Sequence, residues 1–218
     1  MKFNKSYVGL REDLLKHVKG TKLHILDVGC SVGVNGDFLI NNSIATIVDG
    51  VEFDVEMAQL AQNKYNKVFI GDLNDDEFLD ELRSVNIDYD FIICGDILEH
   101  LSIPKRVLNL LQVKLKPEGK IIVSLPNIAH WELLIQVYKN GKFPRNDRGI
   151  FDKTHLSWFT KKDALNIFSN NKFKNTRYFR NYRYRDDGRK PNILMYQFLK
   201  LFFKNLVTFQ HIIVAQKL

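Results

Sequence analysis

Short apolar runs alternate with amphipathic segments along residues 4–125. The apolar runs predict buried strands at residues 23–28, 45–53, 67–70, 90–94 and 120–125. Apolar residues at helical spacing predict helices at residues 4–19, 35–41, 54–63, 75–85 and 104–115. Ser6 and Gly20 are the expected cap and stop of the first helix. This alternation is typical of an open, mostly parallel sheet with helices on both faces.

The alternation ends after residue 125. A helix is predicted at residues 127–140, and the segment 141–159 is irregular and rich in Pro, Gly, Asp and aromatic residues. Thr160 and Asp163 have the spacing of a reciprocal helix cap and predict a helix that runs to about residue 170. An extended segment at 173–185, a helix at 192–204 and a last strand at 206–216 complete the chain. Because no repeat or disordered linker interrupts this order, we expect one α/β domain over residues 1–218.

The composition is that of an ordinary globular protein. Of 218 residues, 45% are hydrophobic and 26% are charged, and two cysteines are too few for a disulfide framework. The first residues lack the apolar core of a signal peptide, and polar residues interrupt the apolar stretch near the end of the chain. We therefore expect no membrane span and a reducing, cytoplasmic location.

Positive charge gathers in one segment. Residues 172–190 hold eight Lys or Arg against two Asp, a net of +6, whereas the whole chain carries +7. The string RYFRNYRYR at 177–185 suits nucleic acid, since arginine neutralises phosphates and tyrosine stacks on bases. The nearly neutral remainder disfavours that interpretation. A cationic edge strand, the pyrophosphate of a nucleotide- or lipid-linked sugar, or a peripheral membrane contact fits equally well.

The string LHILDVGCSVGVNG at residues 23–36 predicts a strand, a glycine turn and a helix start. Asp27 interrupts the apolar strand, and a buried carboxylate needs partners or a function. Gly29 and Gly33 permit positive φ and the close approach of a ligand. The unpaired N–H groups and positive dipole of the helix start then favour an anionic group.

This stretch resembles the first motif of class I S-adenosylmethionine-dependent methyltransferases. The dinucleotide fingerprint would require glycine where the chain has Gly29, Ser31 and Val34, so that alternative is weak. Ser31 also departs from the methyltransferase pattern, which usually has a middle glycine there. The resemblance implies a doubly wound, mostly parallel seven-stranded sheet whose last strand is antiparallel. It also implies that Cys30 and Ser31 lie beside S-adenosyl-L-methionine.

Acidic residues recur at the ends of the predicted strands. Glu52 lies roughly 20 residues beyond the glycine turn, where a carboxylate can accept from both ribose hydroxyls. Asp49 and Asp54 compete for that role, although Asp54 is better placed as a helix cap. Phe53 either lies against the adenine or belongs to the core.

Three further cofactor contacts are implied by the family resemblance. Asp72 would accept from the adenine amino group with the backbone of Leu73 beside it, or it would be an ordinary turn aspartate. Gly95 would let the backbone approach the methionine moiety. The string CGDILEHL at residues 94–101 is similar to the family's segment after the fourth strand, and His100 then acts as a general base or only positions the loop.

Two further strings resemble a bacterial branch of the family that acts in O-antigen, capsule and related glycan synthesis. They are PN-x-x-H-W from residue 126 and D-x-T-H-L-x-x-F-T from residue 152. The resemblance implies O-methylation of a sugar or glycan intermediate of cell-surface polysaccharide synthesis. It divides the chain into an N-terminal helix (1–22), a cofactor-binding half (23–125) and a substrate-side half (126–218) with a lid at 141–160. Asp152 and His155 of the lid are candidate catalytic residues, with a structural role for His155 as the alternative.

Other chemistry finds less support in the sequence. His100, His130 and His155 are scattered along the chain, and no Cys/His pair has zinc spacing, so we expect no metal site. An RNA or small-molecule methyltransferase of the same fold is the alternative enzyme. A catalytically silent module that keeps the cofactor pocket, or an adaptor using the basic strand, is the alternative outside enzymes.

Overall fold

The computed structural model describes residues 8–169, 172–185 and 192–218. Within them, seven strands form one sheet in the order β3-β2-β1-β4-β5-β7-β6. The strands are β1 (Leu23–Val28), β2 (Ala45–Glu52), β3 (Lys67–Ile70), β4 (Tyr89–Gly95), β5 (Leu115–Pro126), β6 (Phe173–Tyr182) and β7 (Thr208–Lys217). Strands β1 to β5 pair in parallel, whereas β7 is antiparallel to both β5 and β6. The predicted fold class is confirmed.

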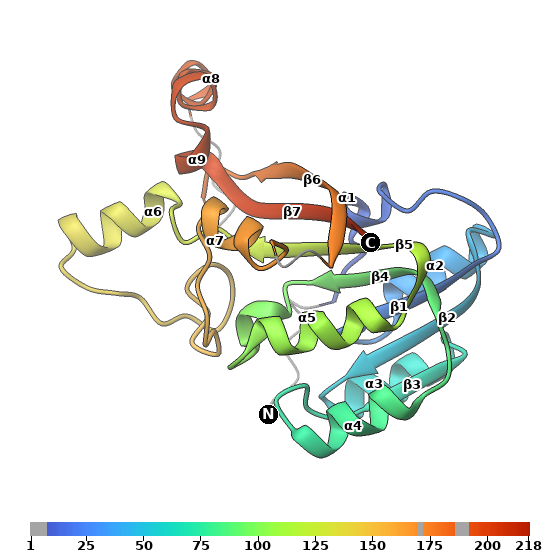
Figure 1. The fold of residues 1–218 in the computed structure, drawn as a ribbon. Coiled ribbons are helices and arrows are strands. Elements are labelled where there is room, and N and C mark those ends of the chain that lie inside the picture. The colour runs from blue at the N-terminus through green and yellow to red at the C-terminus, as the bar shows by residue number, and fades with distance from the viewer. Residues whose placement is uncertain (1–7, 170–171, 186–191) are drawn as a thin grey trace.

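Helices cover both faces of this sheet (Figure 1). Apolar residues of α4 (Asp76–Ser84), α5 (Pro104–Val113) and α7 (Lys161–Asn166) build the core on one face. Those of α1 (Glu12–Leu15), α2 (Val34–Asn41) and α3 (Val55–Gln62) build it on the other. The remaining helical segments are η2 (Leu98–His100), α6 (Trp131–Leu134), the π-helical η3 (Ile135–Lys139), α8 (Ile193–Phe202) and α9 (Lys204–Val207).

Two predicted helices are too long. The helix expected at residues 4–19 is reduced to α1, and its expected cap, Ser6, lies outside the described residues. Arg11 does not continue α1 toward the N-terminus, because its backbone N–H donates to the Asn35 side chain and its guanidinium turns toward Asp96. The helix expected at 127–140 begins only at Trp131, because the backbone of Asn127 pairs with β7 through the carbonyl of Phe209.

The P-N-x-x-H-W string has a structural role in this arrangement. The Asn127 amide donates to the carbonyls of Asn205 and Thr208, so its oxygen accepts from His211 of β7. The ring of His130 bonds to the carbonyl of Arg183, just beyond β6. The string therefore fastens the chain after β5 to the two last strands of the sheet.

Burial of histidine makes the fold sensitive to acid. Burial lowers the pKa of His130, His155 and His211 from 6.5 to about 4 in each case. Between pH 6.5 and 4 the unfolded chain therefore binds protons that these folded side chains do not, so stability falls as the pH falls. Burial raises the pKa of Asp27 to about 6, and it also raises the pKa of Glu99. These two carboxyl groups oppose part of the effect of the histidines on stability.

We expect the free energy of unfolding to drop by a few kcal/mol between pH 7 and pH 5, because each pKa unit is worth about 1.4 kcal/mol. Urea denaturation at the two pH values measures this drop. His211→Gln should flatten the dependence, since it removes one of the three histidines. Equal or greater stability at pH 5 would contradict the prediction.

The C-terminal helix α8 is confirmed, but it stands away from the sheet beyond α9 (Figure 1). Asn192 caps it through the backbone N–H groups of Leu194 and Met195. None of its residues is buried. The structure thus presents an apolar helix that the core does not use.

Candidate functional site

A cleft of about 720 Å³ opens at the carboxyl ends of β1 to β4. Open parallel sheets bind ligands at this edge, near the point where the strand order reverses. Most of the residues predicted as site residues line it, namely Asp27, Gly29, Cys30, Ser31, Glu52, Phe53, Asp72, Leu73, Gly95, His100, Asp152 and His155. Gly33 does not line the cleft; it is the residue that precedes α2.

The glycine turn has the backbone that its sequence predicts. Gly29 has φ +76°, and a Cβ there would lie 2.0 Å from the side chain of Ile97, so any other residue would be strained and would displace Ile97. Gly33 begins α2 with φ +80°. Ser31 also has a positive φ, of +50°, which explains why a glycine is usual at this position of the motif. The departure from the motif therefore places an L-residue in a strained conformation and leaves the turn intact.

Glu52 holds the end of β2 against this turn. One carboxylate oxygen accepts from the N–H of Ser31 at 2.7 Å, and the other accepts from Phe53 and Asp54 at 2.9 Å each. Asp54 caps α3, and Asp49 is buried against the hydroxyl of Tyr89. Glu52 and Asp54 both line the cleft, and of these two Asp54 is the one engaged as a helix cap.

Two aromatic residues near the turn differ in role. Phe53 is 58% exposed at the rim of the cleft, so the alternative of a core phenylalanine is wrong. Tyr65, which the sequence analysis did not single out, donates to the buried Asp27 at 2.7 Å and accepts from the backbone of Gly36. Asp27 therefore has partners, Tyr65 and Asn35, that anchor the start of α2.

Asp72, Leu73 and Gly95, which were predicted to contact the adenine and the methionine moiety, differ in their surroundings. Asp72 accepts hydrogen bonds from the backbone N–H and the side-chain amide of Asn74. It therefore forms the ordinary aspartate turn of the alternative prediction, and it also lines the cleft. Leu73 beside it is buried. The guanidinium of Arg11 lies over Gly95, 3.1 Å from the position that a Cβ on Gly95 would occupy.

Arg11 is a cleft residue that sequence reasoning missed. Its guanidinium bonds to Asp13 and Asp96 at 2.9 Å each and to the hydroxyl of Ser124 at 3.0 Å. These contacts hold Asp96 at a positive φ of +57°, directly after β4. A single arginine before a short helix has no pattern in the sequence that would have identified it.

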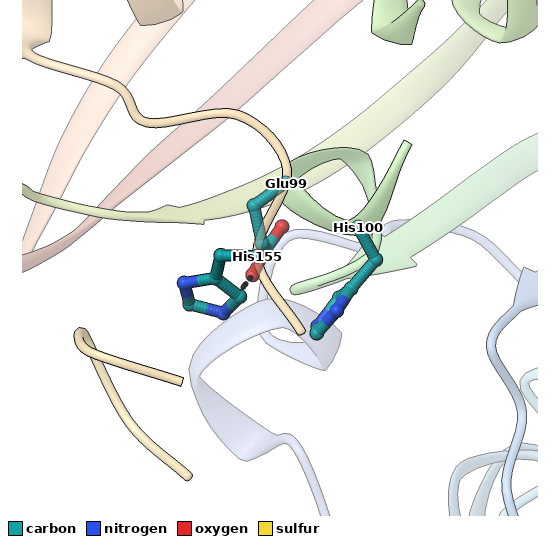
Figure 2. Close-up of side chains that lie close together, drawn as sticks. All are labelled: Glu99, His100 and His155. Carbon is teal, nitrogen blue, oxygen red and sulfur yellow. Dashed lines mark ion pairs between the residues drawn. The ribbon is translucent and has the colours of Figure 1, made fainter. Parts of the chain in front are cut away.

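The structure brings His100 and His155 together, so the expectation that these histidines are scattered is wrong. Their ring centroids are 4.8 Å apart, and Nε2 of His155 lies 4.0 Å from Oε1 of Glu99 (Figure 2). His155 reaches this position because the backbone N–H groups of Leu156 and Ser157 donate to the carbonyl of Glu99. Part of the segment 141–160 therefore lies against the loop after β4.

A relay of hydrogen bonds fixes the protonation of His100. The hydroxyl of Thr154 donates to Asp152 at 2.6 Å, so its oxygen accepts from Nδ1 of His100 at 3.0 Å. His100 therefore carries its proton on Nδ1 and has a lone pair on Nε2. Burial also lowers the pKa of His100, which keeps the ring neutral at pH 7.

The site can thus supply basic nitrogen next to a buried carboxyl group. His155 is neutral at pH 7 because burial lowers its pKa to about 4, and His100 beside it adds to the lowering. Burial raises the pKa of Glu99 well above its usual range. Groups in a cleft whose pKa values are shifted in this way are typical of functional sites.

The comparisons with known proteins agree with this geometry. The sequence profile of a family described as "Methyltransferase domain" matches residues 6–178. A ubiquinone biosynthesis O-methyltransferase of Rickettsia canadensis is 36% identical over 109 residues, which are 49% of this chain and 44% of the relative. The chain therefore spans less than half the length of this curated relative.

Solved structures share the fold at lower identity. A SAM-dependent methyltransferase from Archaeoglobus fulgidus is 19% identical with a TM-score of 0.67, covering 93% of this chain and 89% of its own. The magnesium protoporphyrin IX methyltransferase of Synechocystis PCC 6803, solved with bound SAH, is 17% identical with a TM-score of 0.57, covering 93% and 77%.

Proposed function

The chain belongs to the methyltransferase domain family of S-adenosylmethionine-dependent enzymes, and from this premise we propose that it methylates a hydroxyl oxygen. The observation that carries the proposal is the pair of neutral histidines, His100 and His155, in the cleft beyond the glycine turn. A hydroxyl acceptor must lose a proton, and a neutral imidazole can take it near neutral pH. When bound, S-adenosylmethionine supplies an electrophilic methyl group on a positively charged sulfur.

The residues of the cleft fit that cofactor. Glu52 offers a carboxylate already oriented by three backbone N–H groups, which suits a ribose with two hydroxyls. Phe53 offers an exposed ring at the rim for the base, with Asp72 and Leu73 on the next strand end. Gly29 and Ser31 of the glycine turn line the same cleft.

The same histidines act on the acceptor side. In this proposal His155 takes the proton of the hydroxyl, and the Asp152–Thr154 pair keeps His100 oriented beside it. His155 is buried and His100 is half-buried, which limits the access of bulk water to the nucleophile. The chain's main contribution is then to hold the acceptor oxygen in line for transfer.

We propose a sugar or glycan intermediate, linked to a nucleotide or lipid through phosphate, as the acceptor. The acceptor side of the cleft is lined by Arg148, Asn181, Arg183 and Gln210 beside the ring of Phe209. Cations suit phosphate, amides suit hydroxyls, and an aromatic ring suits the apolar face of a sugar. A hydroxylated aromatic acceptor is the second candidate, because the curated relatives are named as ubiquinone biosynthesis O-methyltransferases.

A panel of acceptors separates these candidates. The protein is incubated with S-adenosylmethionine carrying a deuterated methyl group and with nucleotide sugars, glycan fragments, dihydroxyaromatics or RNA. Mass spectrometry should detect the labelled methyl on an oxygen of a glycan or nucleotide sugar, together with S-adenosylhomocysteine. Labelling of the aromatic set alone would select the second candidate, and labelling of RNA alone would overturn both.

We further propose that α8 and the end of β6 contact an anionic membrane surface. Ile193, Leu194, Phe198, Leu201 and Phe202 are exposed on α8. Lys200 of α8 lies over Tyr182 of β6, which joins this apolar helix to the arginine-rich edge strand. An apolar helix beside a cationic edge suits an interface of acidic lipids. In the part of the chain that is described, no helix has the length and apolar character to cross a bilayer.

Vesicle sedimentation tests the membrane contact. We expect binding to vesicles that contain phosphatidylglycerol and little binding to pure phosphatidylcholine, because cations and apolar side chains act together. Replacing Leu194 and Phe198 by serine should reduce binding by about tenfold or more, given about 0.8 kcal/mol for each buried CH₂. Leu60→Ser is the control, because Leu60 is also an exposed leucine on a helix, α3. Binding that the double variant does not weaken would contradict the contact.

A further inference from the structure

We propose that Glu99, His100 and His155 form a binding site for a divalent transition-metal ion, with Zn²⁺ as the best match. One ligand atom of each side chain lies within 4.8 Å of the others. Two of the ligands come from the η2 turn after β4, and the third comes from the segment 141–160 that lies against it (Figure 2). The site would therefore join the cofactor-binding half of the chain to the substrate-side half.

The state of Glu99 is the strongest observation. Its side chain is 1% exposed, and neither carboxylate oxygen has a hydrogen-bond partner. A buried polar group without partners costs about 1–3 kcal/mol, and more if it is charged. Arg11, a cation that also lines the cleft, is engaged by Asp13 and Asp96. A metal ion would give this carboxylate the positive partner that residues 8–169, 172–185 and 192–218 do not supply.

The two histidines are prepared for ligation. The Thr154 hydroxyl accepts from Nδ1 of His100, so the lone pair on Nε2 is available. His155 places its Nε2 4.0 Å from Oε1 of Glu99. Metal-ligating histidines characteristically donate their other N–H to a carboxylate, a carbonyl or another oriented group. Asp152 and Thr154 then act as positioning residues for His100.

The chemistry of the ligands selects the class of metal. Two imidazoles and one carboxylate match the three-ligand sets of catalytic zinc sites, which leave a fourth position open. Imidazole favours Zn²⁺, Fe²⁺ or Ni²⁺ over Mg²⁺ and Ca²⁺, which prefer sites made of oxygen alone. Tetrahedral ligands about 2.1 Å from the ion lie about 3.4 Å apart, so the three side chains need to move inward by roughly 1 Å.

The open position faces the cleft, because all three side chains line it. A hydroxyl bound there would lose its proton to solvent more readily, since a bound cation lowers the pKa of its oxygen ligand. With the ion bound, the lone pair of His155 would be on the metal, so the ion would replace His155 as the group that activates the hydroxyl. This use of the site depends on the proposed O-methylation, whereas binding of the metal does not. Metal binding and the use of the metal in catalysis can therefore be disproved separately.

Metal binding is measured directly on the full chain without cofactor or acceptor. The chelator-treated protein is titrated with Zn²⁺ against a chromophoric competitor, and with Co²⁺ by visible absorption. We expect about one ion per chain. Glu99→Gln and His155→Ala should lower affinity by about a hundredfold or more, and Thr154→Val by roughly 10–100-fold, as for other losses around metal ligands.

His24→Ala is the control for adventitious binding, because His24 lies at the opposite end of β1 from the cleft. It should bind metal as the wild type does. Binding of S-adenosylhomocysteine reports the fold of every variant, and Glu99→Gln preserves the shape of the side chain if His155→Ala fails to fold. Absence of wild-type binding, or binding that survives Glu99→Gln, would overturn the site. If the metal binds but its removal leaves turnover unchanged, only the use of the metal in catalysis would be overturned.

Discussion

His155→Ala should lower turnover by about a hundredfold or more, the loss expected when a general base or an activating ligand is removed. His155 is the histidine that faces Glu99 from the segment 141–160, and its neutral ring lines the cleft. No contact of His155 reaches Glu52 or the glycine turn in the described residues, so affinity for S-adenosylmethionine should stay within a few-fold. Steady-state kinetics and calorimetry on the same preparation test both parts.

Thermal melting separates a site role for His155 from a structural one. Lost turnover at an unchanged melting temperature supports the site, whereas a parallel loss of both would assign His155 to holding the segment 141–160. Thr154 provides a matched pair, because Thr154→Ser keeps the hydroxyl that bonds to His100 and Thr154→Val removes it. We expect near-normal turnover for the serine variant and reduced turnover for the valine variant.

Glu52→Ala should weaken binding of S-adenosylmethionine and of S-adenosylhomocysteine by roughly tenfold to a hundredfold. Hydrogen bonds to a charged group contribute about 1.5–3 kcal/mol, and each 1.4 kcal/mol is tenfold in affinity. The structure adds a second reason, since the same carboxylate fixes the backbone of Ser31 in the glycine turn. Titration calorimetry with both ligands measures the effect.

Asp54→Ala is the control for this substitution. Asp54 stands two residues away, but its carboxylate caps α3 through Glu56 and Met57. Its loss should cost about 1 kcal/mol of stability and leave ligand affinity nearly unchanged. Unchanged affinity in Glu52→Ala would remove Glu52 from the ribose site.

The strand ends of the first half were predictable because two independent patterns coincide there. Apolar runs of four to eight residues give β1 to β4, and a carboxylate or glycine follows each run. Parallel strands bring those ends to one edge, so Glu52, Asp72 and Gly95 meet although they are far apart in sequence. Local periodicity and sheet topology therefore sufficed to place these residues around one cleft, whereas their roles toward the cofactor came from the family resemblance.

The acceptor side depended on contacts that no local pattern contains. His100 and His155 meet only because the backbone after His155 bonds to the carbonyl of Glu99. The position of Arg11 depends on the path of a short helix that periodicity extended too far. The conformation of an irregular segment depends on such single contacts. The sequence therefore singled out residues 141–160 as a candidate lid but did not predict the positions of its side chains.

The measurement that tests the central claim most directly is an experimental structure of the protein with S-adenosylhomocysteine. The account predicts the ribose hydroxyls on Glu52, the adenine between Phe53 and Leu73, and the homocysteine over the turn at Gly29. The sulfur should then point toward His100 and His155. Ligand bound elsewhere, or a ribose with no contact to Glu52, would contradict the account.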